Sequence, residues 1–308
     1  MTRASSHSAQ SQRVSVACVT QDRPRDVDQL IAGLRSQTDP IDSLCLVDAG
    51  KTPLDEAHLR GLIDGAFELR YLRSVANLGG AGGFSLAILT ALSTGADQVW
   101  LMDDDAHPED EHCLRTLRQA AAERNLAVVS PLIVAPQDHG TLSFPFRLEG
   151  TITHSRADIE SLRFIPSYAA FFNGALMDES VFFTVGLPDL KLFLRGDEVD
   201  FLVRLRKSGL PFGTVTTTAV AHPPGWEEEQ VVIPGKLQVL IPPGQFKQQH
   251  FFRNRGYVSW RYKRVVQLTA DAIGYPAYYL QRGDLKGLRT WAGRYVNGMR
   301  GRGFGGPR

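Results

Sequence analysis

Apolar and polar positions follow two periods in the first part of the chain. Residues 13–20 alternate with a period of two, as in a half-buried strand, and residues 26–37 carry apolar side chains at helical spacing. Residues 43–48 form an apolar run that ends on an acid, which is typical of a buried parallel strand. The sequence therefore predicts a strand, a helix and a second strand in succession.

The same cycle continues to residue 103. Strands are predicted over 68–73 and 98–102, and a helix over 84–94 follows a glycine-rich turn. Strands that alternate with helices predict an α/β fold with a Rossmann-like, mostly parallel sheet and helices on both faces. In such a fold, ligands bind at the carboxyl ends of the strands.

Shorter apolar runs mark the second half of the chain. We expect loops around 136–140, a core strand over 168–177 and a helix over 199–208. A Pro-Pro-Gly sequence at 242–244 is a natural boundary. The predicted organisation is a flexible tail over 1–12, a main domain over 13–245 and a helical C-terminal segment over 246–308, of which 298–308 is expected to be disordered.

The C-terminal segment differs from the main domain in charge. The 308 residues carry a formal net charge of +1, but residues 246–308 hold thirteen Lys or Arg against two Asp or Glu. The segment is also rich in aromatic residues, with a helically spaced stripe at Phe251, Val258, Tyr262 and Val265. Basic and aromatic side chains together favour a membrane surface; packing of the stripe on the main domain is the alternative. No RNA or DNA motif accompanies the charge, so no nucleic-acid partner is expected.

Three features of the sequence bear on where in the cell the protein is located. No run approaches eighteen apolar residues, so no membrane-spanning helix is predicted, and the first twelve residues lack the apolar core of a secretory signal. Cys18, Cys45 and Cys113 lack metal-type spacing and are expected to be buried thiols in a reducing compartment. The expectation is a cytoplasmic protein.

Three consecutive carboxylates, Asp103, Asp104 and Asp105, follow the apolar strand that ends at residue 102. Carboxylates at a strand end can converge on a hard divalent cation that also binds diphosphate oxygens. An acidic loop that caps the next helix is an equally good interpretation.

A glycine-rich turn over residues 77–84 opens the predicted helix at 84–94. Glycines allow backbone amides to approach a phosphate or a ribose, and a helix N-terminus favours an anion. The turn matches neither a dinucleotide fingerprint nor a P-loop. A tight structural turn therefore stays an alternative.

Two further features carry ionisable groups. Asp197, Glu198 and Asp200 open the helix predicted over 199–208, where a carboxylate could act as a general base or simply favour the positive end of the helix. His222 follows a β-rich run and could complete a metal site with carboxylates, although a lone histidine is more often structural.

The order of these motifs resembles that of the inverting GT-A glycosyltransferases that include bacterial rhamnosyl- and galactofuranosyltransferases. The resemblance covers about residues 14–263 and rests on the following matches: Thr20 to Pro24, Asn77 to Phe84, Asp103-x-Asp105, Asn173-Gly174-Ala175, Asp197-Glu198 before a helix with Arg204, His222, and Arg253-Asn254-Arg255. Two positions depart from it: Gly186-Leu-Pro-Asp189 stands where relatives often have Gly-Gly-Phe-Asp, and the chain lacks the extra domains of the related galactan polymerase. Within the family, the chain looks most similar to the branch that starts galactan synthesis. The main domain would then be a GT-A catalytic domain.

The resemblance implies a role for each matching residue. Asp103, Asp105 and His222 would hold Mn²⁺ or Mg²⁺. The donor would be bound by Thr20, Arg23, Asp48, Asn77, Gly82, Gly83, Asp103 and Asp104. Glu198 would be the catalytic base with Asp197 beside it, and the acceptor would be bound by Asn173, Asp197, Asp200 and Trp226.

The implied reaction moves galactofuranose, with inversion, from a UDP-sugar donor to a rhamnosyl-N-acetylglucosaminyl-diphospho-polyprenol acceptor. The basic segment would then hold the enzyme peripherally at the inner membrane surface. A dTDP-rhamnose-dependent rhamnosyltransferase and a non-catalytic sugar-nucleotide-binding scaffold are the alternatives. A homo-oligomer is left open, as are the linkage positions and the choice between Glu198 and Asp197 as base.

Overall fold

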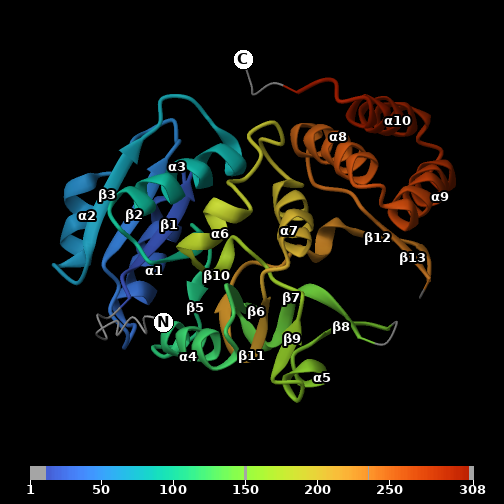
Figure 1. Ribbon diagram of the computed structural model, residues 1–308. Coiled ribbons are helices and arrows are strands. Elements are labelled where there is room, and N and C mark those ends of the chain that lie inside the picture. Colours follow the sequence, from blue (N-terminus) through green and yellow to red (C-terminus); the bar gives the residue numbers. More distant parts are fainter. Residues whose placement is uncertain (1–11, 149–150, 235, 305–308) are drawn as a thin grey trace, which may run out of the picture.

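A large sheet runs through the molecule in the computed structural model, which describes residues 12–148, 151–234 and 236–304 (Figure 1). Its main strands, in spatial order, are β3 (Glu68–Arg73), β2 (Ser43–Asp48), β1 (Val14–Thr20), β4 (Gln98–Asp103), β10 (Asn173–Asp178), β6 (Val128–Ala135), β11 (Phe212–Ala221) and β5 (His107–Pro108). Strands β3, β2, β1 and β4 are parallel, as are β6 and β11, whereas β10 runs antiparallel to both its neighbours. The mostly parallel sheet predicted from the sequence is confirmed.

Helices cover both faces of this sheet, as predicted. One face carries α1 (Pro24–Arg35), α2 (Glu56–Ile63) and α4 (Cys113–Arg124); the other carries α3 (Gly79–Ser93), α6 (Glu179–Thr184) and α7 (Asp197–Ser208). Strand residues alternate between the two: Val16 and Cys18 pack with α1, and Ala17 packs with α3. Fully buried side chains such as Leu30 and Ile31 each contribute about 1.5–3 kcal/mol. Helices α2 and α4 were not predicted from the sequence.

Two expectations in the middle of the chain are only partly correct. The loop expected around 136–140 is confined to a turn at 136–137, because β7 (Asp138–Leu148) begins directly after it and pairs with β6 and β8 (Thr151–Ser155). The strand predicted over 168–177 begins only at Asn173, where the register against β4 shifts. The cause is local: Gly174 has φ +104°, and Phe172 leaves the sheet to stack on Phe84. Helix α5 (Ala157–Glu160) and β9 (Phe164–Pro166) complete this region.

The C-terminal helices form a packed unit with a hairpin. The short helix η1 (Trp226–Glu228) leads into β12 (Glu229–Ile233) and β13 (Leu237–Leu240), followed by α8 (Gln245–Arg261), α9 (Val265–Gln281) and α10 (Leu285–Met299). Phe252, Tyr275, Trp291 and the hairpin residue Val239 share one core. A Cβ at Gly256 would lie 2.2 Å from the Tyr295 carbonyl oxygen, so glycine allows α8 and α10 to approach closely.

The predicted stripe on this segment does not form one exposed face. Val258 is buried, Phe251 is half-buried and α8 ends before Val265. The end of the chain is also more ordered than predicted, because Arg253 lies over the Phe304 ring and donates to the Gly303 carbonyl. Residues 1–11 and 305–308 lie outside the described residues. Within the described ranges, none of the helices has the length and hydropathy needed to cross a membrane.

The three cysteines are buried free thiols, as predicted. Cys18 and Cys45 lie in the central strands β1 and β2, and Cys113 begins α4. Burial raises the pKa of each thiol, which keeps it protonated and unreactive.

We expect His250 to make the stability of the protein depend on pH. Its ring is buried and its Nδ1 accepts from Arg253 at 3.0 Å, so burial first and then the charge of Arg253 lower its pKa to about 4. In the unfolded chain the imidazole binds a proton near pH 6.5, whereas in the folded protein it does so only near pH 4. The neutral, buried His250 therefore contributes its full share to stability above about pH 6.5, and this share is lost as the pH falls toward 4. The variant His250→Asn keeps an acceptor without a titrating proton. Urea unfolding at pH 7 and pH 5 should show a smaller loss for this variant than for wild type; equal losses would contradict the assignment.

Candidate active site

A cavity of about 610 Å³ opens at the carboxyl ends of β4 and β11. Its wall includes these residues predicted for the site: Arg23, Asp103, Asp104, Asp105, Asn173, Asp197, Glu198 and His222. They come from the ends of separate strands and from the start of α7. Parallel strands place their carboxyl ends at one edge of a sheet, which explains why residues so far apart in sequence meet here.

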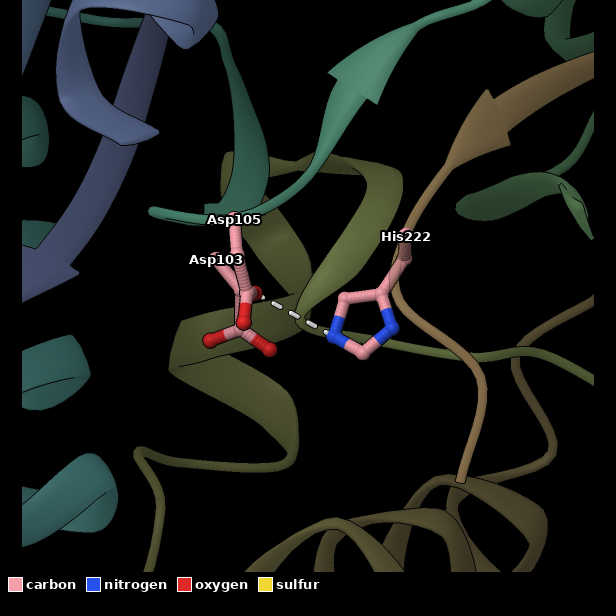
Figure 2. A group of neighbouring side chains, drawn as sticks. All are labelled: Asp103, Asp105 and His222. Atoms are coloured by element: carbon pink, nitrogen blue, oxygen red, sulfur yellow. Dashed lines mark ion pairs between the residues drawn. The ribbon is translucent and has the colours of Figure 1, made fainter. Parts of the chain in front are cut away.

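Asp103, Asp105 and His222 form the centre of this cavity. Each offers one ligand atom, and these atoms lie within 4.8 Å of one another. Figure 2 shows the two carboxylates, from the end of β4, pointing toward the imidazole that follows β11. His222 Nε2 lies 3.2 Å from an Asp105 oxygen. Two carboxylates and one imidazole suit Mn²⁺ or Mg²⁺, and the Nδ1 of His222 is buried with no partner among the described residues.

Asp104 and Asp105 are held by cationic and hydroxyl partners. Thr20 donates to Asp104 at 2.7 Å, and Arg23 pairs with Asp104 at 3.1 Å and with Asp105. Burial alone would raise the pKa of Asp105, but the hydrogen bond and charge of His222, together with Arg23, hold that pKa at about 2. Asp105 is therefore ionised across the physiological range.

Asp103 lies in the opposite environment. Burial raises the pKa of its carboxyl well above the usual value, and the charges of Asp105, Glu198, Asp104 and Asp197 add to this effect. Its carboxylate makes no hydrogen bond or ion pair among the residues that the structure describes. Such a concentration of acids needs a cation to be stable with every group ionised.

The acid pair Asp197-Glu198 opens α7 beside this cluster. Both side chains line the cavity, and the Phe172 N–H donates to Glu198 Oε1 at 3.3 Å. Burial, followed by the charge of Glu198, raises the pKa of Asp197 to about 7. Burial also raises the pKa of Glu198, against the opposing effects of the Phe172 amide and His222. A raised carboxyl pKa in a cavity is typical of acid–base groups.

The loop before α7 is fixed by a side chain from α8. Asn254 is fully buried, and its amide nitrogen lies 2.7, 2.9 and 2.5 Å from the carbonyl oxygens of Leu192, Leu194 and Arg195. Arg195 has φ +66° and the following Gly196 has φ +102°. This unfavourable backbone therefore depends on Asn254, which places the acid pair at the cavity.

Replacing Asn254 by Asp should destabilise the protein. The carboxylate oxygen that replaces the amide nitrogen would meet three carbonyl oxygens in a fully buried site, at an expected cost of about 3 kcal/mol in the free energy of unfolding. Urea denaturation measures this loss. The matched control is Asn125→Asp, an exposed helix-end position where a change within about 0.5 kcal/mol is expected. Equal effects at the two positions would show that Asn254 does not hold the loop.

The glycine-rich run is not a turn before the helix, as predicted, because α3 already begins at Gly79, and its glycines have mainly a packing role. Of these glycines only Gly80 lines the cavity; Gly82 and Gly83 are buried, and a Cβ at Gly83 would lie 2.5 Å from the Val19 side chain. Gly79 has φ +67°, and a Cβ there would lie 2.1 Å from the Phe193 carbonyl oxygen. These glycines thus let α3 pack closely on β1 and on the loop before α7.

Five other predicted residues lie outside the cavity wall, and one of them, Thr20, donates to Asp104. Asp48 is buried and accepts from Tyr71 at 2.6 Å and from backbone amides, while Asn77 bonds to Gln21. Asp200 is buried on α7 and bonds to Arg204 and Tyr262. Trp226 donates to the Leu142 carbonyl. The structure therefore shows structural contacts for these residues.

Sequence reasoning missed two features of the cavity wall. In this wall, Arg195 and Glu228 form an ion pair with two hydrogen bonds. Phe84 also stacks on Phe172, with ring centroids 4.1 Å apart. Neither pair carries a motif, because the partners are far apart in sequence. Asn173 was predicted, and its Oδ1 is buried with no partner among the described residues.

A parallel sheet with an Asp-x-Asp at one strand end, a histidine at another and an acid pair between them defines a GT-A glycosyltransferase. The model of Glycosyl transferase family 2 matches residues 15–180, and the chain belongs to this family. The chain is 38% identical over 292 residues to the galactofuranosyltransferase GlfT1 of Mycobacterium tuberculosis (strain CDC 1551 / Oshkosh), covering 91% of this chain and 93% of that protein. The resemblance to GT-A galactofuranosyltransferases predicted from the motifs is confirmed.

Solved structures agree on the fold. TarS 1-349 of S. aureus matches with a TM-score of 0.61 at 10% identity, covering 94% of this chain and 81% of that one. The mannosyltransferase PcManGT of Pyrobaculum calidifontis, solved with GDP-Man and Mn²⁺, matches with a TM-score of 0.51 at 15% identity, covering 95% and 76%. At these identities the comparison establishes the GT-A fold.

Proposed function

We propose that the enzyme transfers galactofuranose from UDP-galactofuranose to a rhamnosyl-N-acetylglucosaminyl-diphospho-polyprenol, with inversion at the anomeric carbon. The observation that carries this proposal is the 38% identity to a galactofuranosyltransferase over nearly the whole length of both chains. The acid cluster and the acid pair in one cavity supply the chemistry that such a transfer needs.

Asp103, Asp105 and His222 would hold Mn²⁺ or Mg²⁺ in this enzyme. The bound cation would neutralise charge on the diphosphate leaving group. The mannosyltransferase neighbour, solved with Mn²⁺, supports this choice of ion. Arg23 now pairs with Asp104 and Asp105, so it can exchange one carboxylate for a phosphate oxygen of the donor.

Glu198 would act as the base that removes the proton of the acceptor hydroxyl. It lies at the start of a rigid helix, and the Phe172 amide holds one of its oxygens in place. Asp197 and Asn173 would orient the acceptor, since both line the same cavity. A single displacement from the face opposite the leaving group inverts the anomeric carbon without a covalent intermediate.

The other residues predicted to bind the donor or the acceptor act indirectly in this proposal. Thr20 would position Asp104, and Gly82 and Gly83 would set the approach of α3 to the donor side of the cavity. Asp48 and Asn77 would shape the loops at the ends of β2 and β3. Asp200 and Trp226 would support the acceptor side from outside the wall.

The C-terminal segment would meet the membrane through α9. Val266, Ile273 and Leu280 are spaced by seven residues and are 87%, 57% and 58% exposed, so they lie on one face of the helix. Exposed Arg282 and Lys286 follow directly. Apolar side chains beside cations suit an anionic lipid surface.

Replacing Val266 and Ile273 together by Asp should weaken binding to vesicles that contain phosphatidylglycerol by about tenfold or more, because it removes apolar area and adds repulsion. Vesicle sedimentation at low and high salt measures this. The control pair, Val75→Asp and Leu89→Asp, is exposed in the segment after β3 and on α3, which lie away from α9 (Figure 1). Equal binding by the two double variants would remove the membrane role of α9.

Transfer of radiolabelled galactofuranose to a synthetic rhamnosyl-N-acetylglucosamine lipid, with Mn²⁺ and with chelator, tests the proposed reaction. Cation-dependent product is expected. Product from dTDP-rhamnose instead would establish the rhamnosyltransferase alternative. Donor binding without any transfer would favour a non-catalytic scaffold. Sedimentation of the purified enzyme would show whether it is a homo-oligomer.

A further inference from the structure

The two ends of the cavity differ in charge. The acids and His222 described above form one end. The wall also includes three basic residues, Lys247, Arg255 and Arg264, from α8 and the junction between α8 and α9. The proposed reaction assigns no role to these cations.

Two of the three cations lack a counter-ion. Arg255 pairs with the buried Asp271 at 2.8 Å. Lys247 and Arg264 are half-buried, and neither side chain makes a hydrogen bond or ion pair within the part of the chain that the structure describes. Burial, and then the charge of Arg255, lowers the pKa of Arg264, so an anion beside it would be stabilising.

Glu228 and Glu229, on the same wall, face other partners. Glu228 is held by Arg195 through two bonds, and the nearest basic group to Glu229 is His154, at 3.9 Å. Neither carboxylate pairs with Lys247 or Arg264. The excess positive charge at this end is therefore available to a ligand.

Apolar side chains adjoin the cations. Phe251, Val258 and Leu240 line the same cavity, and Val265 and Val266, which follow Arg264, are 67% and 87% exposed. A free phosphate would leave these surfaces in water. A diphosphate attached to an isoprenoid chain would match both the cations and the apolar residues.

We propose that Arg264 and Lys247, next to Arg255, bind the diphosphate of the lipid-linked acceptor. This inference rests on the proposed function and extends it, because it separates the acceptor diphosphate from the donor diphosphate at the acidic end. It also places the lipid chain toward the exposed start of α9 and the acceptor glycan toward Glu198.

The test compares two acceptors with purified full-length Arg264→Gln. One carries the disaccharide on a prenyl diphosphate, and the other carries it on a neutral octyl group. The ratio of kcat/KM for the diphosphate acceptor to that for the octyl acceptor should fall by about 10- to 100-fold, because a charge-assisted contact is lost. Lys247→Gln should lower the ratio in the same direction, and Arg264→Lys should restore part of it.

Arg300→Gln is the matched control, since it removes one exposed positive charge outside the cavity wall. The Arg300→Gln enzyme should show the wild-type ratio of kcat/KM for the diphosphate acceptor to kcat/KM for the octyl acceptor. An unchanged ratio in Arg264→Gln would overturn the proposal. So would a rise in the KM for UDP-galactofuranose with no change for the acceptor, because the cations would then bind the donor.

Direct binding separates this proposal from the proposed function. If wild type transfers no galactofuranose to either acceptor, the proposed function fails. Geranyl diphosphate is then titrated into protein saturated with UDP and Mn²⁺. Binding that is about 10- to 100-fold weaker in Arg264→Gln would support the subsite, and equal binding would overturn it.

Discussion

Glu198→Gln should lower kcat by about 10²- to 10⁴-fold, because the amide cannot accept the proton of the acceptor hydroxyl. Gln has the size of Glu and can still accept the hydrogen bond from the Phe172 amide. The cavity should therefore keep its shape, and the KM for the donor should stay near the wild-type value. Steady-state kinetics with saturating donor and cation measure both quantities.

Asp197→Asn is the matched comparison for this prediction. Asp197 precedes Glu198 on the same helix end and lines the same cavity, and burial raises the pKa of both carboxyls. If Asp197 only orients the acceptor, its replacement should raise the acceptor KM more than it lowers kcat. A Glu198→Gln enzyme with wild-type kcat, beside an inactive Asp197→Asn enzyme, would move the base to Asp197.

The central acids could be predicted because strand ends leave a local signature. Asp103 and Asp105 follow an apolar run, His222 follows a β-rich run, and parallel pairing brings such ends together. The contacts of Asn254 leave no such signature. They depend on a left-handed backbone at Phe193 and Arg195, residue types that seldom adopt it.

Local composition did not predict the role of a segment where that role depends on how the segment packs. The glycines after Asn77 suggested a phosphate-binding turn, but Gly83 and Gly79 serve close contacts with Val19 and Phe193. The aromatic residues of the C-terminal segment suggested a membrane interface, but Tyr275 and Trp291 turn inward to form a core. Both outcomes depend on partners distant in sequence, which periodicity does not reveal.

Replacing Asp103 by Asn should separate activity from stability. With no cation bound, Asp103 lies among four other acids, so its ionised form is unfavourable. The amide removes this repulsion, and the midpoint of thermal unfolding without metal should rise by about 2–4 °C for each kcal/mol gained. The folded protein holds the Asp103 proton to a higher pH than the unfolded chain, so the contribution of Asp103 to wild-type stability falls as the pH rises above about 4. The gain from Asp103→Asn should therefore be larger at pH 8 than at pH 5.

The same variant should lose the response to metal and most of its activity. Wild type should gain stability on addition of Mn²⁺, because the ion binds only the folded cluster, and Asp103→Asn should gain much less. Its kcat should fall by about 10³-fold, since charge on the leaving group is no longer neutralised. Asp64→Asn, an exposed position at a helix end, is the control and should match wild type in both assays. A wild-type Mn²⁺ response in Asp103→Asn would show that the cation binds elsewhere, because a site built from Asp103, Asp105 and His222 cannot lose one carboxylate without losing affinity.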